Sequence, residues 1–161
     1  MILESIEEFI LNIPTNSAIM GLDLGEKTIG IAVSDRCLTV ATGIKTIKRT
    51  KFQNDLKLLL DLIKDRQIGG IILGLPKNMN GSEGPRCQST RAFARNMSNI
   101  IETSISFWDE RLSTVAAERI LLEANASRKR RSEVIDYVAA SYILQGVLNR
   151  IGKLQELRLR H

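Results

Sequence analysis

Acidic residues occupy three places in the sequence where the surrounding pattern predicts apolar ones. Asp23 lies inside one apolar run, Asp109 and Glu110 end a second run, and Asp136 lies near the start of an expected helix. A buried carboxylate without a partner costs several kcal/mol, so each of these groups needs a partner. Two ordinary structural roles stay open: a hydrogen bond to the following turn for Asp23, and a helix-dipole interaction for Asp136.

If the three acidic positions converge, their carboxylates would form a binding site for a hard cation. Mg²⁺ and Mn²⁺ are bound by carboxylate oxygens and completed by phosphate oxygens of a substrate. Two such ions, about 3.5–4 Å apart, activate water and stabilise the leaving oxygen in phosphodiester cleavage. The acids therefore favour a metal-dependent nuclease.

Other common catalytic centres lack their residues. The only histidine is His161, the last residue, and the two cysteines, Cys37 and Cys87, are 50 residues apart with no CxxC pair. The sequence therefore offers almost none of the residues that a zinc site, a Ser/His/Asp triad or a Cys/His pair requires. Any metal must be held by carboxylates.

The charge is uneven along the chain. The sequence holds 23 Lys plus Arg against 18 Asp plus Glu, for a net charge of +5. Residues 1–35 carry a net −5 and residues 36–161 a net +10. A basic body indicates a polyanionic partner, most simply nucleic acid, although a solvated basic surface is the plain alternative.

Length and hydropathy favour one cytoplasmic domain. The chain has 161 residues, of which 43% are apolar, and this size suits a single core. No apolar run approaches the roughly 18–20 residues of a membrane span. The acidic N-terminus lacks the basic start of a signal peptide, so we expect no membrane partner.

Two other function classes are open from the residues alone. Gly21–Gly25 (Gly-Leu-Asp-Leu-Gly) resembles the first phosphate loop of actin-like ATPases, but those proteins close two such domains around the nucleotide. A non-catalytic nucleic-acid-binding module is also open, in which the acids are only structural. Few aromatic residues lie outside the expected helices, which leaves little for a stacking platform.

The apolar spacing predicts an α/β fold with the order β-β-β-α-β-α-β-α-α. Three strands come first, the third within 38–47, and a helix begins at Phe52; a strand buried on both faces covers 68–75. After this strand we expect a second helix and a strand over 105–110. These are followed by a helix from Ser113 or Thr114 to about Asn125, a basic turn at 128–131 and a last helix over 132–150. Residues 1–16 read as a short helix ending at Pro14, or as a loosely held extension. This order predicts a five-stranded mixed sheet with helices on both faces. It divides the chain into an N-terminal extension (1–17), one domain (18–150) and a basic C-terminal tail (151–161).

Several sequence motifs, in order, resemble those of one known family. They are Gly21–Gly25 with Gly30–Asp35, Gly74–Pro76 with Asn78–Pro85, Trp108–Thr114, Arg128–Arg131, and Ile135-Asp136 with Ala139-Ala140. Over roughly residues 18–150 the chain is similar to the YqgF/RuvX group of RNase H-like proteins, known as pre-16S rRNA nucleases or Holliday junction resolvase-like proteins. The resemblance implies an RNase H-like sheet and a carboxylate metal site for Mg²⁺ or Mn²⁺.

The resemblance also implies roles for the acidic residues. Asp23, Glu110 and Asp136 would hold the metal. Neighbouring strand residues face opposite sides of a sheet, so only one of Asp109 and Glu110 is the direct ligand; Glu110 is favoured, with Asp109 as a supporting catalytic-site acid. Junction resolvases carry a glutamate on the strand matching 71–75, where this chain has glycine and leucine at 74 and 75. That departure weakens a direct transfer of junction cleavage.

The expected nucleic-acid contacts come from basic and hydroxyl residues. Lys27 stands where the family usually has arginine, which keeps the charge but loses the bidentate phosphate contact. Ser113 and Thr114 at a helix N-terminus would contact phosphates, with a plain helix cap as the alternative. The remaining expected contacts are Arg111 and the basic stretch Arg128, Lys129, Arg130 and Arg131.

Together these features predict a metal-dependent nuclease of structured nucleic acid. The resemblance points to processing of the 5′ end of pre-16S rRNA in ribosome biogenesis. The alternative partner is branched DNA, cut by a Holliday junction resolvase that would need a two-fold dimer for paired cuts. The expected oligomeric state is a monomer or a weak homodimer.

Overall fold

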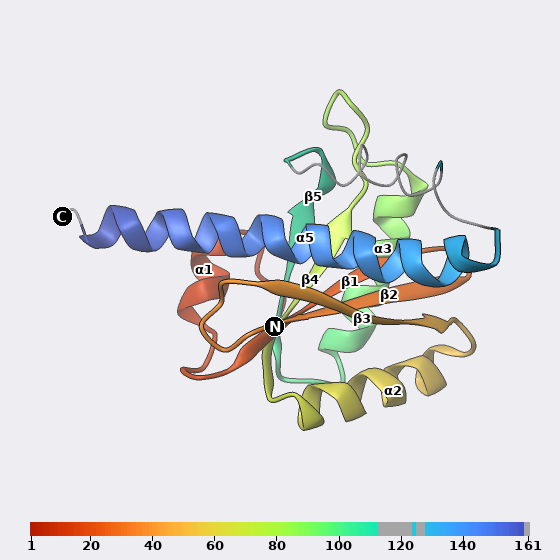
Figure 1. Cartoon of the computed structure of the whole chain (residues 1–161), viewed down its shortest axis with the longest axis horizontal. Helices are drawn as coiled ribbons and strands as arrows, with labels where there is room; N and C mark the ends of the chain where they lie inside the picture. The colour runs from red at the N-terminus through yellow and green to blue at the C-terminus, as the bar shows by residue number, and fades with distance from the viewer. Residues whose placement is uncertain (113–123, 125–127, 160–161) are drawn as a thin grey trace.

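The computed structural model describes residues 1–112, 124 and 128–159. Within them the chain forms five strands, four α-helices and a short 3₁₀ helix (Figure 1). In chain order these are α1 (Ile6–Leu11), β1 (Ala18–Leu24), β2 (Thr28–Ser34), β3 (Ala41–Lys48), α2 (Phe52–Asp65), β4 (Ile68–Leu75), α3 (Pro85–Ser98), β5 (Ser104–Asp109), η1 (Glu110–Leu112) and α5 (Arg128–Leu159). None of the described helices is both long and apolar enough to cross a membrane.

The predicted mixed sheet is confirmed. The strands lie in the order β3-β2-β1-β4-β5, with β1–β2 and β2–β3 antiparallel and β1–β4 and β4–β5 parallel. A parallel pair needs a crossover connection, which α2 and α3 provide. The strand at 68–75 has the predicted bounds and is buried along almost its whole length. Apart from residue 124, the helix expected between about 113 and 125 lies outside the described residues.

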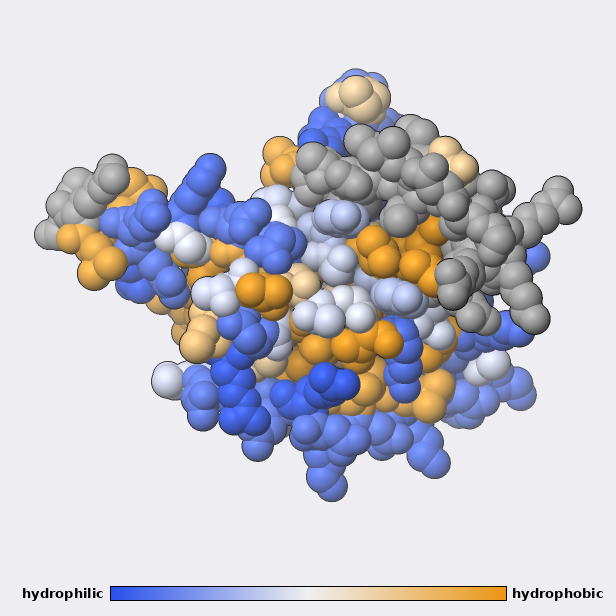
Figure 2. Space-filling view, viewed as in Figure 1, coloured by the Kyte–Doolittle hydropathy of each residue, from blue (hydrophilic) through white to orange (hydrophobic). Residues whose placement is uncertain are grey.

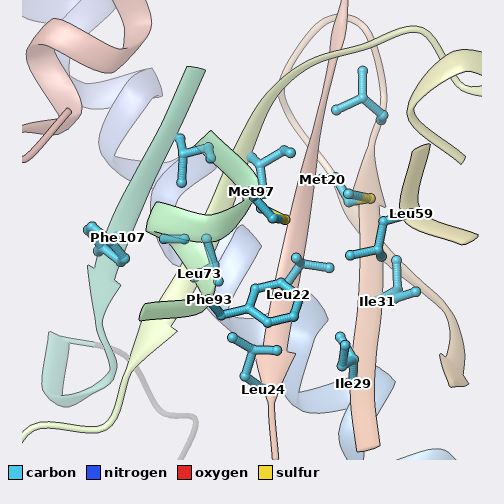
Figure 3. Close-up of a cluster of buried hydrophobic side chains, with 14 of the residues drawn as sticks. Met20, Leu22, Leu24, Ile29, Ile31, Leu59, Leu73, Phe93, Met97 and Phe107 are labelled. Carbon is cyan, nitrogen blue, oxygen red and sulfur yellow. The ribbon is translucent and has the colours of Figure 1, made fainter. Parts of the chain in front are cut away.

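Each face of the sheet packs against its own helices. Alternate residues of β1, including Met20, Leu22 and Leu24, point toward α2 and α3, where Phe93 and Met97 of α3 complete one core (Figure 3). The other alternate set begins with Ile19 and packs under α5, which lies across the sheet (Figure 1). Because side chains alternate along a strand, the position of a residue in its strand determines whether it faces α5 or the helices α2 and α3.

Glycines in the sheet allow α5 to approach its backbone. A Cβ on Gly30 would lie 2.0 Å from the carbonyl oxygen of Asp136, and one on Gly43 would lie 2.6 Å from that of Tyr137. A Cβ on Gly21 would lie 2.9 Å from the Cβ of Leu144. These three glycines, in three adjacent strands, form the surface on which α5 rests.

Two helix predictions need correction. The last helix begins at Arg128, so the basic stretch at 128–131 forms its first turn rather than a separate turn. It also continues through Leu159, past the expected tail boundary, because Lys, Gln, Glu, Leu and Arg are good helix formers. Gly152 does not end it, and a Cβ there would meet nothing within 4 Å.

The N-terminal segment is shorter as a helix than predicted, but it is docked. Asn12 ends α1, and Phe9 is fully buried against the α5 face. Before α1, Leu3 donates its N–H to the carbonyl of Ile105, whose own N–H donates to the carbonyl of Met1. The segment therefore pairs with β5 rather than hanging loosely.

The glycine surface yields a stability prediction. Gly30→Ala should lower the free energy of unfolding by about 3 kcal/mol, because the added methyl meets the α5 backbone rather than a movable side chain. Gly152→Ala is the matched control and should leave stability unchanged or raise it by up to about 1 kcal/mol. Urea unfolding measures both; equal stability of the two variants would contradict the close approach.

Candidate active site

Asp23 lies on the α5 face of the central strand. It follows Ile19 and Gly21 in the alternation of β1, and both of those residues face α5. Asp23 is only 5% exposed, as the sequence pattern predicted. Its cross-strand partner in β2 is Gly30.

Asp136 lies over that same pair. Its carbonyl oxygen lies against Gly30, and its carboxylate Oδ2 accepts a hydrogen bond of 2.6 Å from the hydroxyl of Thr28. Because α5 begins at Arg128, Asp136 is about two turns inside the helix. The alternative of a helix-dipole role in the first turn therefore does not apply.

Glu110 and Asp109 diverge to opposite sides of the sheet. Glu110 follows β5 in η1, and its Oε1 lies 2.9 Å from the place of a Cβ on Gly74, beside Ile143 of α5. Glu110 is thus on the α5 face with Asp23. Asp109 instead pairs in register with Leu75, which belongs to the core under α2 and α3. Of these two acids, Glu110 is therefore the one that shares a face of the sheet with Asp23.

The position of Glu110 bears on the missing glutamate in the fourth strand. On the strand over 71–75, where the resemblance implies a glutamate in junction resolvases, this chain has Gly74 and Leu75. Here the Glu110 carboxylate lies in the space that a side chain at 74 would need. A carboxylate therefore reaches the space beside Gly74 from the 3₁₀ turn that follows the neighbouring strand.

The three acids share a face and offer only oxygen donors, which suits Mg²⁺ or Mn²⁺. They do not form a closed cluster: among residues 1–112, 124 and 128–159, no group of three or more His, Cys, Asp or Glu is placed to hold a metal ion. The Asp136 carboxylate is directed to Thr28. The donor chemistry and the shared face fit a hard cation, provided that Asp136 exchanges its hydroxyl partner for the metal.

Asp109 holds Arg111 in place. The Arg111 guanidinium donates to both carboxylate oxygens of Asp109, at 2.7 Å for Nη2 to Oδ2, and its Nη1 donates to the carbonyl of Met79 at 3.3 Å. Side-chain hydrogen bonds from Arg111 lower the pKa of the Asp109 carboxyl, opposed by partial burial. Arg111, predicted as a phosphate contact, thus links the end of β5 to the loop before α3.

The other expected nucleic-acid contacts are less defined. Lys27 is exposed at the tip of the β1–β2 hairpin. Arg128, Lys129, Arg130 and Arg131 form the first turn of α5, and only their backbone is described. Ser113 and Thr114 lie outside the described residues.

Sequence reasoning missed two arginines near the hairpin. Arg49 donates to the carbonyl of Gly25 at 2.7 Å, and its own N–H donates to the carbonyl of Lys27. Together with Arg86 it lines a hollow of about 700 Å³ beside Gly25. No local signal marks Arg49, because its role depends on a contact with a turn 24 residues earlier.

Comparison with known proteins identifies the family. The model of the RuvX family, described as Holliday junction resolvase, matches residues 17–150. The chain belongs to the RuvX family. This finding confirms the resemblance drawn from the motifs.

RuvX relatives match along nearly the whole chain. A protein from Ruegeria pomeroyi is 64% identical over 154 residues, covering 96% of this chain and 100% of that protein. One from Paracoccus denitrificans is 60% identical over 151 residues, covering 94% of this chain and 96% of that protein. Both carry the name "Putative pre-16S rRNA nuclease".

Solved structures place this RuvX chain in a broader fold group. Thermus thermophilus RuvC matches with a TM-score of 0.50 at 11% identity, over 84% of this chain and 97% of that one. RuvC from T. thermophilus in complex with a Holliday junction substrate also matches with a TM-score of 0.50, at 9% identity over 84% of this chain and 96% of that one. At such identity the likeness shows the fold alone, and it confirms the RNase H-like α/β class.

The Asp109–Arg111 pair yields a prediction for pH. Because the folded-state pKa of Asp109 is lowered, the pair contributes stability above the unfolded pKa of about 3.9, and this is lost as pH falls through the folded pKa. Carbon NMR titration should show Asp109 ionising below that value, and Arg111→Ala should move its pKa back toward it. Identical titration in both proteins would contradict the pairing.

Proposed function

We propose that this RuvX protein is a metal-dependent phosphodiesterase that cleaves structured RNA. The observation that carries the proposal is the shared position of Asp23, Glu110 and Asp136, which come from two distant strand ends and a helix to one face of the sheet. Oxygen donors inside a basic chain fit a phosphate substrate with a hard cation.

Different residues of the chain would bind the metal and the substrate. Asp23 on the rigid central strand, Glu110 and Asp136 would hold Mg²⁺ or Mn²⁺. When bound, such an ion offsets charge on the phosphate oxygens and lowers the pKa of water. Lys27, with Arg49 beside it at the hairpin, would hold the strand by its phosphates. Asp109 would position Arg111 and, through it, the loop before α3.

The relatives and the charge support a class of substrate. The RuvX relatives that match nearly end to end are named for pre-16S rRNA, and this supports processing of a ribosomal RNA precursor here. The net charge of +5 supports a polyanion in general. A nuclease of this kind would take part in ribosome biogenesis, which is consistent with a location in the cytoplasm.

A second candidate function is cleavage of a four-way DNA junction. The description of the family model favours it. Paired cuts would need two active sites related by a two-fold axis, hence a homodimer.

The first test removes one carboxylate. Asp23→Asn should reduce cleavage of a labelled ribosomal RNA precursor in Mn²⁺ by at least about a thousandfold, since a metal ligand contributes several kcal/mol to catalysis. Asp61→Asn, an exposed acid on α2, is the matched control and should cleave normally. Circular dichroism and urea unfolding check that both variants are folded.

A four-way DNA junction is assayed in parallel, each substrate also with EDTA. Metal-dependent cutting of RNA alone, lost in Asp23→Asn, supports the proposal. Paired cuts in the junction alone would favour the resolvase. Undiminished cutting by folded Asp23→Asn would refute the metal-site assignment.

The basic first turn of α5 gives a separate prediction about binding. Replacing Arg128, Lys129, Arg130 and Arg131 with alanine should weaken RNA binding for all sequences alike and flatten its dependence on salt, because fewer counterions are released. The control removes four exposed cations from the opposite face, in or next to α2 and α3: Lys57, Lys64, Arg66 and Arg95. Equal salt slopes for the two variants would remove this turn from the interface.

A further inference from the structure

A hollow of about 390 Å³ lies next to the candidate active site, where α5 passes over the end of β5. Its floor is Trp108, and its walls include Tyr142, Gly146, Asn149 and Lys153. This volume is within the range of small-molecule sites. Figure 2 shows hydrophilic residues gathered along the C-terminal half of α5 on this face.

Trp108 contributes its ring to this hollow, while its indole N–H is buried against α5 and does not reach the hollow. The residue is 8% exposed, and its Nε1 has no hydrogen-bond partner among the described residues. A Cβ on Gly146 would lie 2.8 Å from that Nε1. Glycine inside a helix costs up to about 1 kcal/mol relative to alanine, and here it makes room for the indole.

The amide of Asn149 presents donors. Gln145 uses its Oε1 to accept from the N–H of Ala41, and its Nε2 to donate to the carbonyl of Thr39 and to Oδ1 of Asn149. The Asn149 oxygen is thereby occupied, and its Nδ2 group is the part left for a ligand. This fixes the orientation of the amide from its contacts.

The remaining polar groups are cationic. Lys153 is exposed, and Arg150, which donates to Glu7 at 3.0 Å, completes the wall. No Asp or Glu is among the described lining residues. The hollow is therefore rich in donors and poor in acceptors, with an aromatic floor and the partly buried ring of Tyr142. A ligand with carbonyl oxygens on a flat ring, attached to phosphate, matches that chemistry.

The hollow and the candidate active site both lie at the end of β5, since Trp108 lines the hollow and stands two residues before Glu110. Trp108 pairs in register with Gly74, over which the Glu110 carboxylate lies. Along α5, Gly146 lies about 15 Å from Asp136, at 1.5 Å per residue. A strand whose phosphate lies at the acids therefore reaches the hollow within a few nucleotides.

We propose that this hollow binds one unpaired base of the RNA substrate, a base with carbonyl oxygens such as uracil, beside the cleavage site. The inference rests on the proposed function for the identity of the substrate. The Asn149 amide donates to a carbonyl oxygen of the base, the rings of Trp108 and Tyr142 contact the base, and Lys153 holds a flanking phosphate. The site selects RNA with an unpaired nucleotide near the cut.

Trp108 is the only tryptophan in the chain, so its fluorescence reports on the hollow directly. The probes are short single-stranded oligouridine and oligoadenosine, added to the full-length protein in EDTA so that no cleavage is needed. We expect oligouridine to quench the fluorescence and to bind about five- to tenfold more tightly than oligoadenosine.

One variant tests the donor. Asn149→Leu keeps the size of an exposed side chain but removes its amide, and it should bring oligouridine binding down to the level of oligoadenosine, measured by anisotropy of labelled probes. Asn54→Leu on α2, an exposed asparagine on the opposite face, is the matched control and should change the binding of neither probe.

The outcomes separate this proposal from the function on which it rests. Absence of quenching, equal binding of both probes by the wild type, or undiminished preference in Asn149→Leu would overturn it, even if RNA is cleaved. Displacement of oligouridine by polyglutamate at equal charge concentration would also overturn it, since the hollow would then be an acidic-peptide site. Preference and quenching without any cleavage would support the base site and count against the nuclease.

Discussion

The close contact between α5 and the sheet is the constraint on which the candidate site depends. At Gly30 the helix backbone lies where a side chain would otherwise stand, so the position of α5 is set by backbone contact. Asp136 comes to Asp23 as a direct result, because Gly30 is the strand partner of Asp23. A helix kept farther away by ordinary side chains would separate these two acids.

The site combines acids of very different rigidity. Asp23 is fixed in the middle of a five-stranded sheet and Asp136 on a helix of 32 residues. Glu110 stands in a short 3₁₀ turn, where the chain has just left the sheet. It nevertheless reaches the space above Gly74, and Asp109 and Arg111 on either side of it tie this turn to the loop around Met79. The least rigid acid is thus flanked by an ion pair that restricts its backbone.

The sequence predicted the strands and the buried acids well, because both leave local signals. Alternation in β1 and the apolar run of β4 determine strand identity, and Asp23 interrupts that pattern visibly. Helix ends were less predictable, because Ser127 and Ser132 both offer a helix start by sequence and no proline marks Leu159 as an end. Contacts across long sequence separations had no local signal at all: the bond from Thr28 to Asp136 spans 108 residues, and the Arg49 contact depends on the hairpin fold.

The pairing of the first residues with β5 also affects how the molecule meets other copies of itself. An edge strand with free N–H and carbonyl groups is a template for adding foreign strands. On β5 the groups of Ile105 are already used by Met1 and Leu3, while β3 at the opposite edge remains largely unburied. A foreign strand that added to β5 at Ile105 would therefore have to displace the chain's own first residues.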